Sequence, residues 1–402
     1  MIFPGSKSSR PKTILLVAMP HSIHTARWIE QLDGQNWNIH LFPSIIGTPL
    51  HPKIRNVTFH NLAYSHRITV SSNVKYGAFG LIRRGIGVAL RYGFAEFFPS
   101  WHGRFLARTV QSLRPDIVHS MEIQSAGYLT LSAKKRVNDA FPPWIVTNWG
   151  SDIYIFGRLE KHKQKIRAVL ASCDYYSCEC NRDVALAKEF GYQKTVLPVM
   201  PNGGGFDLLR LDPIRHRIAP SNRKLIMLKG YQGWAGRALV GLRALERCAA
   251  VLMNYSVVIY AAAPEVAIAA ELFTSKTGIS TCVLPVGTSH DDILAYHSQA
   301  RISIGLSIGD AISTSLLEAM VMGSYPIQSC TACADEWVVH GASASIVPPE
   351  DPDIVETAIR VALADDKLVD NASQINWRVA QARLDSATLR GKAVQMYRNI
   401  MK

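Results

Sequence analysis

The sequence predicts an α/β protein made of two Rossmann-like, doubly wound domains that face a central cleft. Short apolar runs alternate with longer amphipathic runs along most of the 402 residues, which is the pattern of βαβ units and parallel sheets. A segment rich in glycine and proline interrupts this alternation near the middle of the chain. The length is too great for one ordinary domain and suits two. Domains of this kind bind small ligands at the carboxyl ends of their strands.

Each expected strand is a short apolar run, and each expected helix is a longer run with apolar residues at helical spacing. In the first half the strands are Thr13–Met19, Asn38–Phe42, Asp116–Ser120, Trp144–Trp149, Asp174–Cys178 and Thr195–Pro198, and the helices include Thr25–Leu32, Gly103–Leu113 and Glu160–Ala171. In the second half the strands are Lys224–Lys229, Ser256–Ala261, Thr281–Leu284, Arg301–Gly305, Tyr325–Gln328 and Ser345–Val347, and the helices are Arg237–Leu252, Glu265–Lys276, Asp291–Ser298, Ser313–Met322 and Pro352–Ala364.

The domain boundary is expected where glycine and proline cluster. Residues 201–222 contain Gly203-Gly204-Gly205, Pro213 and Pro220, which favour an irregular linker. We therefore expect an N-terminal domain over 1–200, a linker over 201–222, a C-terminal domain over 223–373, and a helical segment over 374–402 that packs back on the N-terminal domain.

Composition excludes several classes of protein. Hydrophobic residues make up 48% and charged residues 19%, so the chain can form real cores and is not globally disordered. The most apolar stretch, 248–273, is interrupted by Asn254, Pro264 and Glu265 and does not read as a membrane span. Seven cysteines, an odd number, indicate reduced thiols and a cytoplasmic protein. The pairs Cys178/Cys180 and Cys330/Cys333 lack a second pair at a familiar distance, so we expect no metal.

The formal charge of +13 lies entirely in the first half. Residues 1–200 hold 25 Lys/Arg against 12 Asp/Glu, and residues 201–402 hold 19 of each. The window from Lys75 to Arg114 mixes seven basic residues with many aromatic ones. This mixture suits an anionic membrane surface, and we expect a peripheral position on the inner face of the cell membrane rather than nucleic acid binding. The alternative is a buried helix face with a solvated basic back.

The densest motif runs from Gly309 to Met320 and predicts a glycine turn followed by a helix that starts near Ser313. The first-turn N–H groups of such a helix suit a phosphate, and Glu318 lies within reach of a ribose. Alternatively, Ser315-Leu-Leu-Glu318 is a capping box in which Glu318 only satisfies the backbone. No GxGxxG follows the first strand and no Walker A sequence occurs, which argues against a dinucleotide oxidoreductase and a P-loop enzyme.

This motif resembles that of the family-4 retaining glycosyltransferases of the GT-B fold. The resemblance lies in the spacing of Asp310 and Glu318, followed by Ala319-Met320-x-x-Gly323-x-x-Pro326-Ile327. Further blocks extend it over most of the chain: Ser22–Trp28, Arg114–His119, Asn148–Asp152, Pro201–Gly203, Ala334–Gly341 and Val347–Asp351.

The resemblance implies roles on the donor side. Glu318 would hold the donor ribose, and Asp310, which stands where Glu is usual, would contact the donor sugar. Lys229 and Arg237 would neutralise the diphosphate, although their order is reversed relative to the family. The other expected donor-binding residues are Gly230, Val286, Gly309, Ser313, Thr314 and Ser315.

The acceptor side departs from the family pattern. The glycine-rich loop after the first strand is absent, Trp149 replaces a histidine, and His119-Ser-Met121-Glu122 replaces His-x-His-Glu. No catalytic histidine is carried over. The acceptor-side candidates are His21, His119, Glu122, Gly150 and Asp152.

The expected activity is retaining transfer of a sugar from a nucleotide-sugar to a saccharide or lipid-linked acceptor, in cell-surface polysaccharide or glycolipid synthesis, with no metal or other cofactor. Two alternatives remain open. One is a sugar-nucleotide epimerase or phosphorylase on the same fold. The other is a non-enzymatic protein that binds an anionic surface or nucleic acid, which would explain the basic half but not the donor-side residues.

Overall fold

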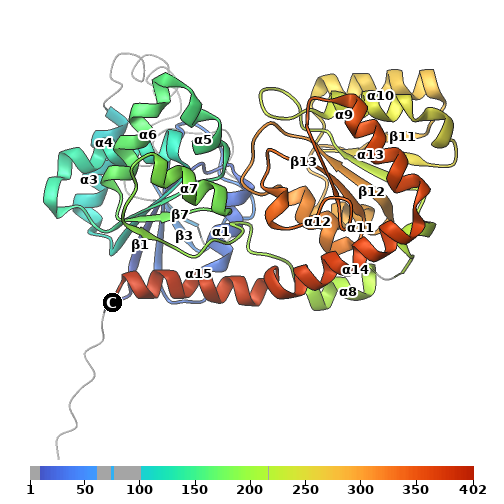
Figure 1. The fold of residues 1–402 in the computed structure, drawn as a ribbon. Coiled ribbons are helices and arrows are strands. Elements are labelled where there is room, and N and C mark those ends of the chain that lie inside the picture. The colour runs from blue at the N-terminus through green and yellow to red at the C-terminus, as the bar shows by residue number, and fades with distance from the viewer. Residues whose placement is uncertain (1–9, 61–73, 77–100, 216) are drawn as a thin grey trace, which may run out of the picture. The chain divides into compact units, whose positions relative to one another are not determined.

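The computed structural model describes residues 10–60, 74–76, 101–215 and 217–402. The chain forms two compact units (Figure 1). Unit 1 contains Met1–Glu179, Asp183–Gly204 and Arg390–Lys402, and unit 2 contains Cys180–Arg182 and Gly205–Leu389.

Unit 1 is built on a parallel sheet in the order β4-β3-β2-β1-β5-β6-β7-β8. The chain leaves the centre in one direction after β1 and in the other after β5, so the sheet is doubly wound as predicted. Every residue of β1 is buried, because helices cover both faces of a sheet of this kind. The strands are β1 (Thr13–Ala18), β2 (Asn38–Pro43), β3 (Val57–Phe59), β4 (Val74–Tyr76), β5 (Ile117–Met121), β6 (Trp144–Thr147), β7 (Tyr175–Ser177) and β8 (Thr195–Val196).

Helices and short turns connect these strands. The described ones are α1 (Ile23–Gln31), α3 (Trp101–Leu113), α4 (Tyr128–Val137), α5 (Ser151–Tyr154), α6 (Glu160–Ser172) and α7 (Asn181–Glu189). A π-helix, η1 (Ile123–Gly127), precedes α4. The basic window from Lys75 to Arg114 falls largely on residues 77–100, which lie outside the described residues.

Unit 2 has a second parallel sheet in the order β11-β10-β9-β12-β13-β14. Its strands are β9 (Leu225–Lys229), β10 (Ser256–Tyr260), β11 (Thr281–Val283), β12 (Ala300–Gly305), β13 (Tyr325–Ser329) and β14 (Ser345–Val347), all predicted to within two residues at each end. Its helices are α8 (Leu208–Arg215), α9 (Ala238–Arg247), α10 (Pro264–Thr277), α11 (His290–Gln299), α12 (Thr314–Met322), α13 (Pro352–Ala364) and α14 (Asp366–Arg383).

The segment expected to be a linker contains ordered structure. Residues 208–215 form α8 despite Pro213, and Arg215 donates from Nη2 to the carbonyl and hydroxyl oxygens of Ser373 on α14. Arg223 donates from Nη1 to the carbonyls of Ala300 and Met322. These buried guanidinium groups tie the start of unit 2 to its sheet and helices, so Gly205 rather than residue 223 begins the unit.

The last helix, α15 (Ser386–Ile400), contributes Arg390 onward to unit 1, whereas α14 belongs to unit 2 (Figure 1). The hydroxyl of Tyr397 accepts a 2.9 Å hydrogen bond from the indole Nε1 of Trp28 on α1. The same hydroxyl contacts Nδ1 of His119 on β5. Residues far apart in the sequence therefore meet in the core of unit 1. None of the described helices combines the length and apolar character that crossing a bilayer requires.

Candidate active site

The predicted donor-side residues follow the carboxyl ends of strands β9 and β12 in unit 2. These strands pair in parallel, so the loops after them begin at the same edge of the sheet and on neighbouring strands. Lys229 is the last residue of β9, and the loop after β12 leads through Asp310 to α12. The architecture therefore brings both groups to one edge of one unit.

The loop after β9 is tight and requires glycine at both ends. A Cβ at Gly230 would lie 2.6 Å from Cα of Ala262, and one at Gly236 would lie 2.0 Å from the carbonyl oxygen of Tyr231. The ammonium of Lys229 lies 5.7 Å from the centre of the Tyr231 ring, a cation–π contact that keeps the cation close to the loop.

Arg237 stands at the N-terminus of α9. Its Nε donates to Oε1 of Glu350 at 2.8 Å and its Nη1 donates to the carbonyl of Gly236 at 2.8 Å. The Arg237 side chain is largely covered, whereas that of Glu350 is largely exposed. A surface carboxylate of this kind is a weak partner that a phosphate can replace.

The helix α12 begins as the motif predicts. Ser313 is its N-cap residue, but the Ser313 hydroxyl contacts the hydroxyl of Ser315 at 2.7 Å and does not cap the backbone. Gly309 is buried before the turn, and Asp310 accepts from the backbone N–H of Ala311 at 3.0 Å. The capping-box alternative is wrong, because the cap is Ser313 rather than Ser315 and the Glu318 carboxylate is engaged elsewhere.

Glu318 is buried against two histidines of α11. Its Oε1 lies 2.9 Å from Nε2 of His290, and its Oε2 lies 3.5 Å from Nε2 of His297. Burial acts to raise the pKa of Glu318, but the contacts with the two histidines outweigh it and hold that pKa well below its usual range. Glu318 is therefore an ionised acceptor of hydrogen bonds, which suits the two hydroxyls of a ribose.

Sequence reasoning missed both histidines. Their spacing of seven residues places them on one face of a helix. This spacing can be read in the sequence and could have indicated that the two histidines act together. Of the remaining donor-side candidates, Thr314 opens α12, and Val286 is fully exposed on the loop after β11.

In unit 1, Glu122 and Asp152 lie in the loops after β5 and β6. Glu122 has φ 92° and ψ 156°, a conformation that is nearly restricted to glycine. Its carboxylate accepts hydrogen bonds from the backbone N–H groups of Ser125 and Ala126 at the start of η1. Oδ2 of Asp152 accepts from the N–H of Ile123 at 2.9 Å.

These two carboxyl groups are buried and interact. Burial and the charge of Glu122 raise the pKa of Asp152 to about 7, and burial likewise raises the pKa of Glu122. A strained residue, a π-helix and two perturbed carboxyls gathered at the carboxyl edge of a sheet are features that cluster at functional sites. The structure thus brings these two acceptor-side candidates together.

The other acceptor-side candidates have different surroundings. His119 has no exposed surface, and its Nε2 lies 2.6 Å from the hydroxyl of Thr147. With Tyr397 on the other nitrogen, and with burial lowering its pKa to about 3, His119 is a neutral core residue that no acceptor can reach in this structure. Gly150 has φ 100° where the chain turns into α5, and His21 is exposed on the loop after β1.

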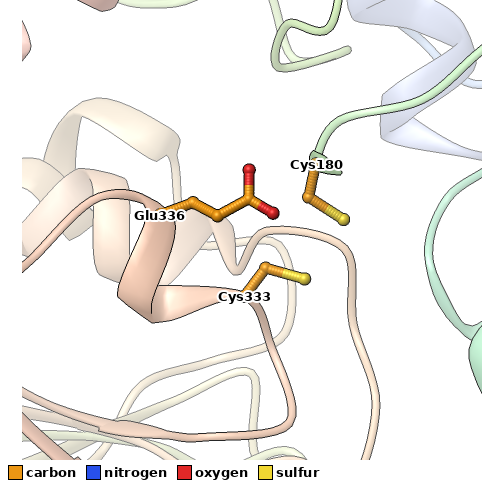
Figure 2. A group of neighbouring side chains, drawn as sticks. All are labelled: Cys180, Cys333 and Glu336. Carbon is orange, nitrogen blue, oxygen red and sulfur yellow. The ribbon is translucent and has the colours of Figure 1, made fainter. Parts of the chain in front are cut away.

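Three side chains of metal-ligand type lie together in unit 2 (Figure 2): Cys180, Cys333 and Glu336. They include one cysteine from each pair seen in the sequence. However, both oxygens of Glu336 already accept from the backbone N–H of Asn181, and one of them also from Arg182. The cysteines pack with Ala311 in an apolar cluster. A structural zinc site needs four ligands, so this group does not fit one.

The sequence also contains one Asp-x-Asp triplet, Asp351-Pro352-Asp353. It begins α13, where the Asp351 carboxylate accepts from the backbone N–H groups of Asp353 and Ile354. The Asp353 carboxylate pairs with Arg247. The Asp351 carboxylate thus caps α13, and the Asp353 carboxylate links α13 to α9.

Comparison with known proteins identifies the family. Residues 104–178 match the model "Glycosyl transferase 4-like" and residues 236–365 match "Glycosyl transferases group 1", together about half of the chain. No curated protein matches the sequence significantly.

Solved structures of glycosyltransferases share the fold. A trehalose-phosphate synthase from Burkholderia xenovorans matches with TM-score 0.68 and 13% identity over 98% of this chain and 100% of that one. HepE from Anabaena, bound to UDP and glucose, matches with TM-score 0.66 and 12% identity over 96% and 98%. Sucrose-phosphate synthase from Thermosynechococcus elongatus matches with TM-score 0.64 and 15% identity over 97% and 99%. The chain belongs to the group 1 glycosyltransferases and has the GT-B fold of two Rossmann-like domains.

Proposed function

We propose that this protein transfers a sugar from a nucleoside diphosphate sugar to a saccharide or lipid-linked saccharide, with retained anomeric configuration and without a divalent metal. The observation that carries the proposal is the ionised, buried Glu318 on the helix α12, whose N-terminus follows the carboxyl edge of the sheet in unit 2. Lys229 is the last residue of the neighbouring strand β9, at the same edge.

Each part of a nucleoside diphosphate has a matching group at this edge. An ionised carboxylate accepts from both ribose hydroxyls, and the first turn of α12 directs N–H groups and the positive end of the helix dipole at a phosphate. Lys229 and Arg237 would balance the charge that grows on the diphosphate as the glycosidic bond breaks. With two cations in that role, a metal ion is not needed for charge balance.

UDP is the first nucleotide to test. The HepE structures contain UDP or UDP-glucose, and the trehalose-phosphate synthase from Burkholderia xenovorans is a UDP-forming enzyme. Retention of configuration rests on the resemblance to the family-4 enzymes. The acceptor and the role in cell-surface polysaccharide or glycolipid synthesis rest on that resemblance and on the basic first half.

Ligand binding and product analysis test the proposal. A thermal-shift panel of UDP, GDP, ADP and CDP should show stabilisation by one of them, since a ligand at 100 times its Kd adds about 2.7 kcal/mol. With the corresponding nucleotide sugar and an acceptor, NMR of the product should show the donor's anomeric configuration, and EDTA should leave the rate unchanged. Turnover of the donor to an epimer or a sugar phosphate without an acceptor would instead favour the epimerase or phosphorylase alternative.

A further inference from the structure

We propose that His290 and His297 are positioning residues that keep the Glu318 carboxylate ionised and oriented for the ribose of the donor. This inference rests on the proposed function, because ribose is the ligand that Glu318 is proposed to bind. Neither histidine belongs to the motif by which the chain resembles other glycosyltransferases. The contacts within unit 2 identify them.

The two histidines form a clamp because of their spacing on α11. A separation of seven residues is close to two helical turns, so both rings point to the same side. One ring nitrogen faces each oxygen of Glu318, His290 at 2.9 Å and His297 at 3.5 Å. The hydrogen bond with His290 holds Oε1, and the buried ring of His297 lies beside Oε2 as a second polar neighbour without a hydrogen bond to it.

The proton positions follow from the charge of Glu318. An ionised carboxylate can only accept, so the nitrogens that face it carry the protons. In His297 the other nitrogen, Nδ1, then accepts from the hydroxyl of Ser303 at 2.9 Å, and Ser303 contacts the hydroxyl of Ser324 at 2.7 Å. These hydroxyls can donate or accept, so they accommodate the His297 tautomer that directs its Nε2–H at Glu318.

The clamp leaves Glu318 able to bind a ligand. Each carboxylate oxygen can accept two hydrogen bonds, so the contacts with the histidines leave acceptor capacity on both. His297 is fully buried, whereas 26% of the His290 side chain is exposed. Solvent therefore reaches this group of side chains at His290, and the ribose would approach Glu318 from the same side.

The histidines also explain why a buried carboxylate stays charged. Burial alone would raise the pKa of Glu318. Tyr260 from β10 also interacts electrostatically with Glu318, and Ser315 is a polar partner of Tyr260. Burial and the charge of Glu318 raise the pKa of Tyr260, so the phenol stays neutral and does not compensate the carboxylate with a charge. Loss of one histidine should therefore let Glu318 take up a proton, and a protonated carboxyl accepts poorly from ribose hydroxyls.

The first test is binding of UDP to the full chain by calorimetry, with GDP, ADP and CDP measured alongside. His290→Ala should weaken nucleotide binding by about tenfold, which corresponds to one hydrogen bond to a charged group. His290→Gln, whose amide can donate to the same oxygen, should recover most of the affinity. His340→Ala, at an exposed histidine of the same unit, is the matched control and should bind as the wild type does.

The second test separates positioning from general stability. The ratio of wild-type to His290→Ala affinity should grow as the pH falls from about 8 to about 5, because only the variant lets Glu318 become protonated. Taking the ratio cancels the titration of the ligand's own phosphate. In a Glu318→Gln background, His290→Ala should have little further effect on affinity, because the charge that it supports is already gone.

The outcomes distinguish the two proposals. If the wild type binds none of the four nucleotides, the proposed function fails and this inference fails with it. If the wild type binds one of them and His290→Ala binds it equally well, this inference alone fails. A ratio that is constant with pH, or an undiminished effect of His290→Ala in the Glu318→Gln background, would also overturn it.

Discussion

Arg237 is paired with Glu350: its Nε donates to Oε1 at 2.8 Å across unit 2. The guanidinium keeps further donors, and its partner is an exposed carboxylate whose loss costs little. Arg237 is therefore held near the loop after β9, and a diphosphate could replace Glu350 as its partner. The positive charges of Lys229 and Arg237 would thus already be in position when a donor binds.

Replacing the cations should slow turnover more than it weakens binding. Lys229→Ala and Arg237→Ala should each lower kcat by about tenfold or more, because the charge on the leaving diphosphate develops in the transition state. Initial rates over a range of donor concentrations separate kcat from KM. Glu350→Gln is the control at the same ion pair, and it should leave kcat close to that of the wild type. A change in KM with kcat unaltered would assign the two cations to ground-state binding only.

Removing the charge of Glu318 should mainly weaken donor binding. Glu318→Gln should cost about 1.5–3 kcal/mol of nucleotide affinity, the range for a hydrogen bond to a charged group. Calorimetry with UDP, or with the best nucleotide of the panel, measures this. Glu265→Gln, at an exposed residue of α10, is the matched control. Unchanged affinity in Glu318→Gln would reduce Glu318 to a structural partner of the two histidines.

The carboxyl pair of unit 1 should make stability depend on pH in an unusual direction. The pKa of Asp152 rises from 3.8 to about 7 on folding, so between these values the folded state holds a proton that the unfolded state has lost. The contribution of Asp152 to stability is therefore full below about pH 4 and is lost as the pH rises towards 7.

The variant Asp152→Asn tests this linkage. Relative to wild type, its stability should improve steadily from pH 4 to pH 7, because the amide never has to ionise in a buried site. Urea unfolding followed by circular dichroism at several pH values gives the difference, and taking the difference removes the effect of titrating groups that do not interact with Asp152. His119, for example, acts in the opposite sense, because burial lowers its pKa to about 3. A difference that does not vary with pH would mean that Asp152 is ionised throughout.

The C-terminal helix should be necessary for the stability of unit 1. Tyr397→Phe removes one hydroxyl and leaves both the Trp28 indole N–H and Nδ1 of His119 without this partner in a buried site. Each unmet group costs about 1–3 kcal/mol. Urea unfolding should show this loss. Tyr255→Phe in unit 2, where Lys224 lies over the ring, is the matched control and should unfold close to the wild type.

The basic first half should attach the protein to anionic vesicles. Sedimentation with vesicles that contain phosphatidylserine should show binding that weakens as salt rises, since screening shortens to about 8 Å near physiological ionic strength. Arg83→Glu with Arg84→Glu should reduce it, whereas Lys224→Glu with Lys367→Glu in the neutral half should not. Equal effects of the two pairs would argue for non-specific attraction to the whole chain.

The sequence predicted the strands and the donor-side edge because their signals are local. Apolar runs mark the buried strands, and the motif from Gly309 to Met320 is continuous in the chain. Strands β3 and β4 were missed. The interpretation of His119 as an acceptor residue could not foresee Tyr397, which comes 278 residues later and occupies its ring nitrogen. The partners of Glu318 were missed because they belong to a different helix.

Because Tyr397 completes the core of unit 1, the order in which the chain is synthesised matters for folding. At about 5–20 residues per second, the ribosome needs roughly 10–40 s to extend the chain from Gly204 to Arg390. During that interval Trp28 and His119 have been synthesised but lack the Tyr397 hydroxyl that contacts both of them. Residues Gly205–Leu389 can meanwhile form the sheet of unit 2. The domain that is translated first is thus the last to be finished, and a nascent chain stalled before α15 would present an incomplete N-terminal core to chaperones.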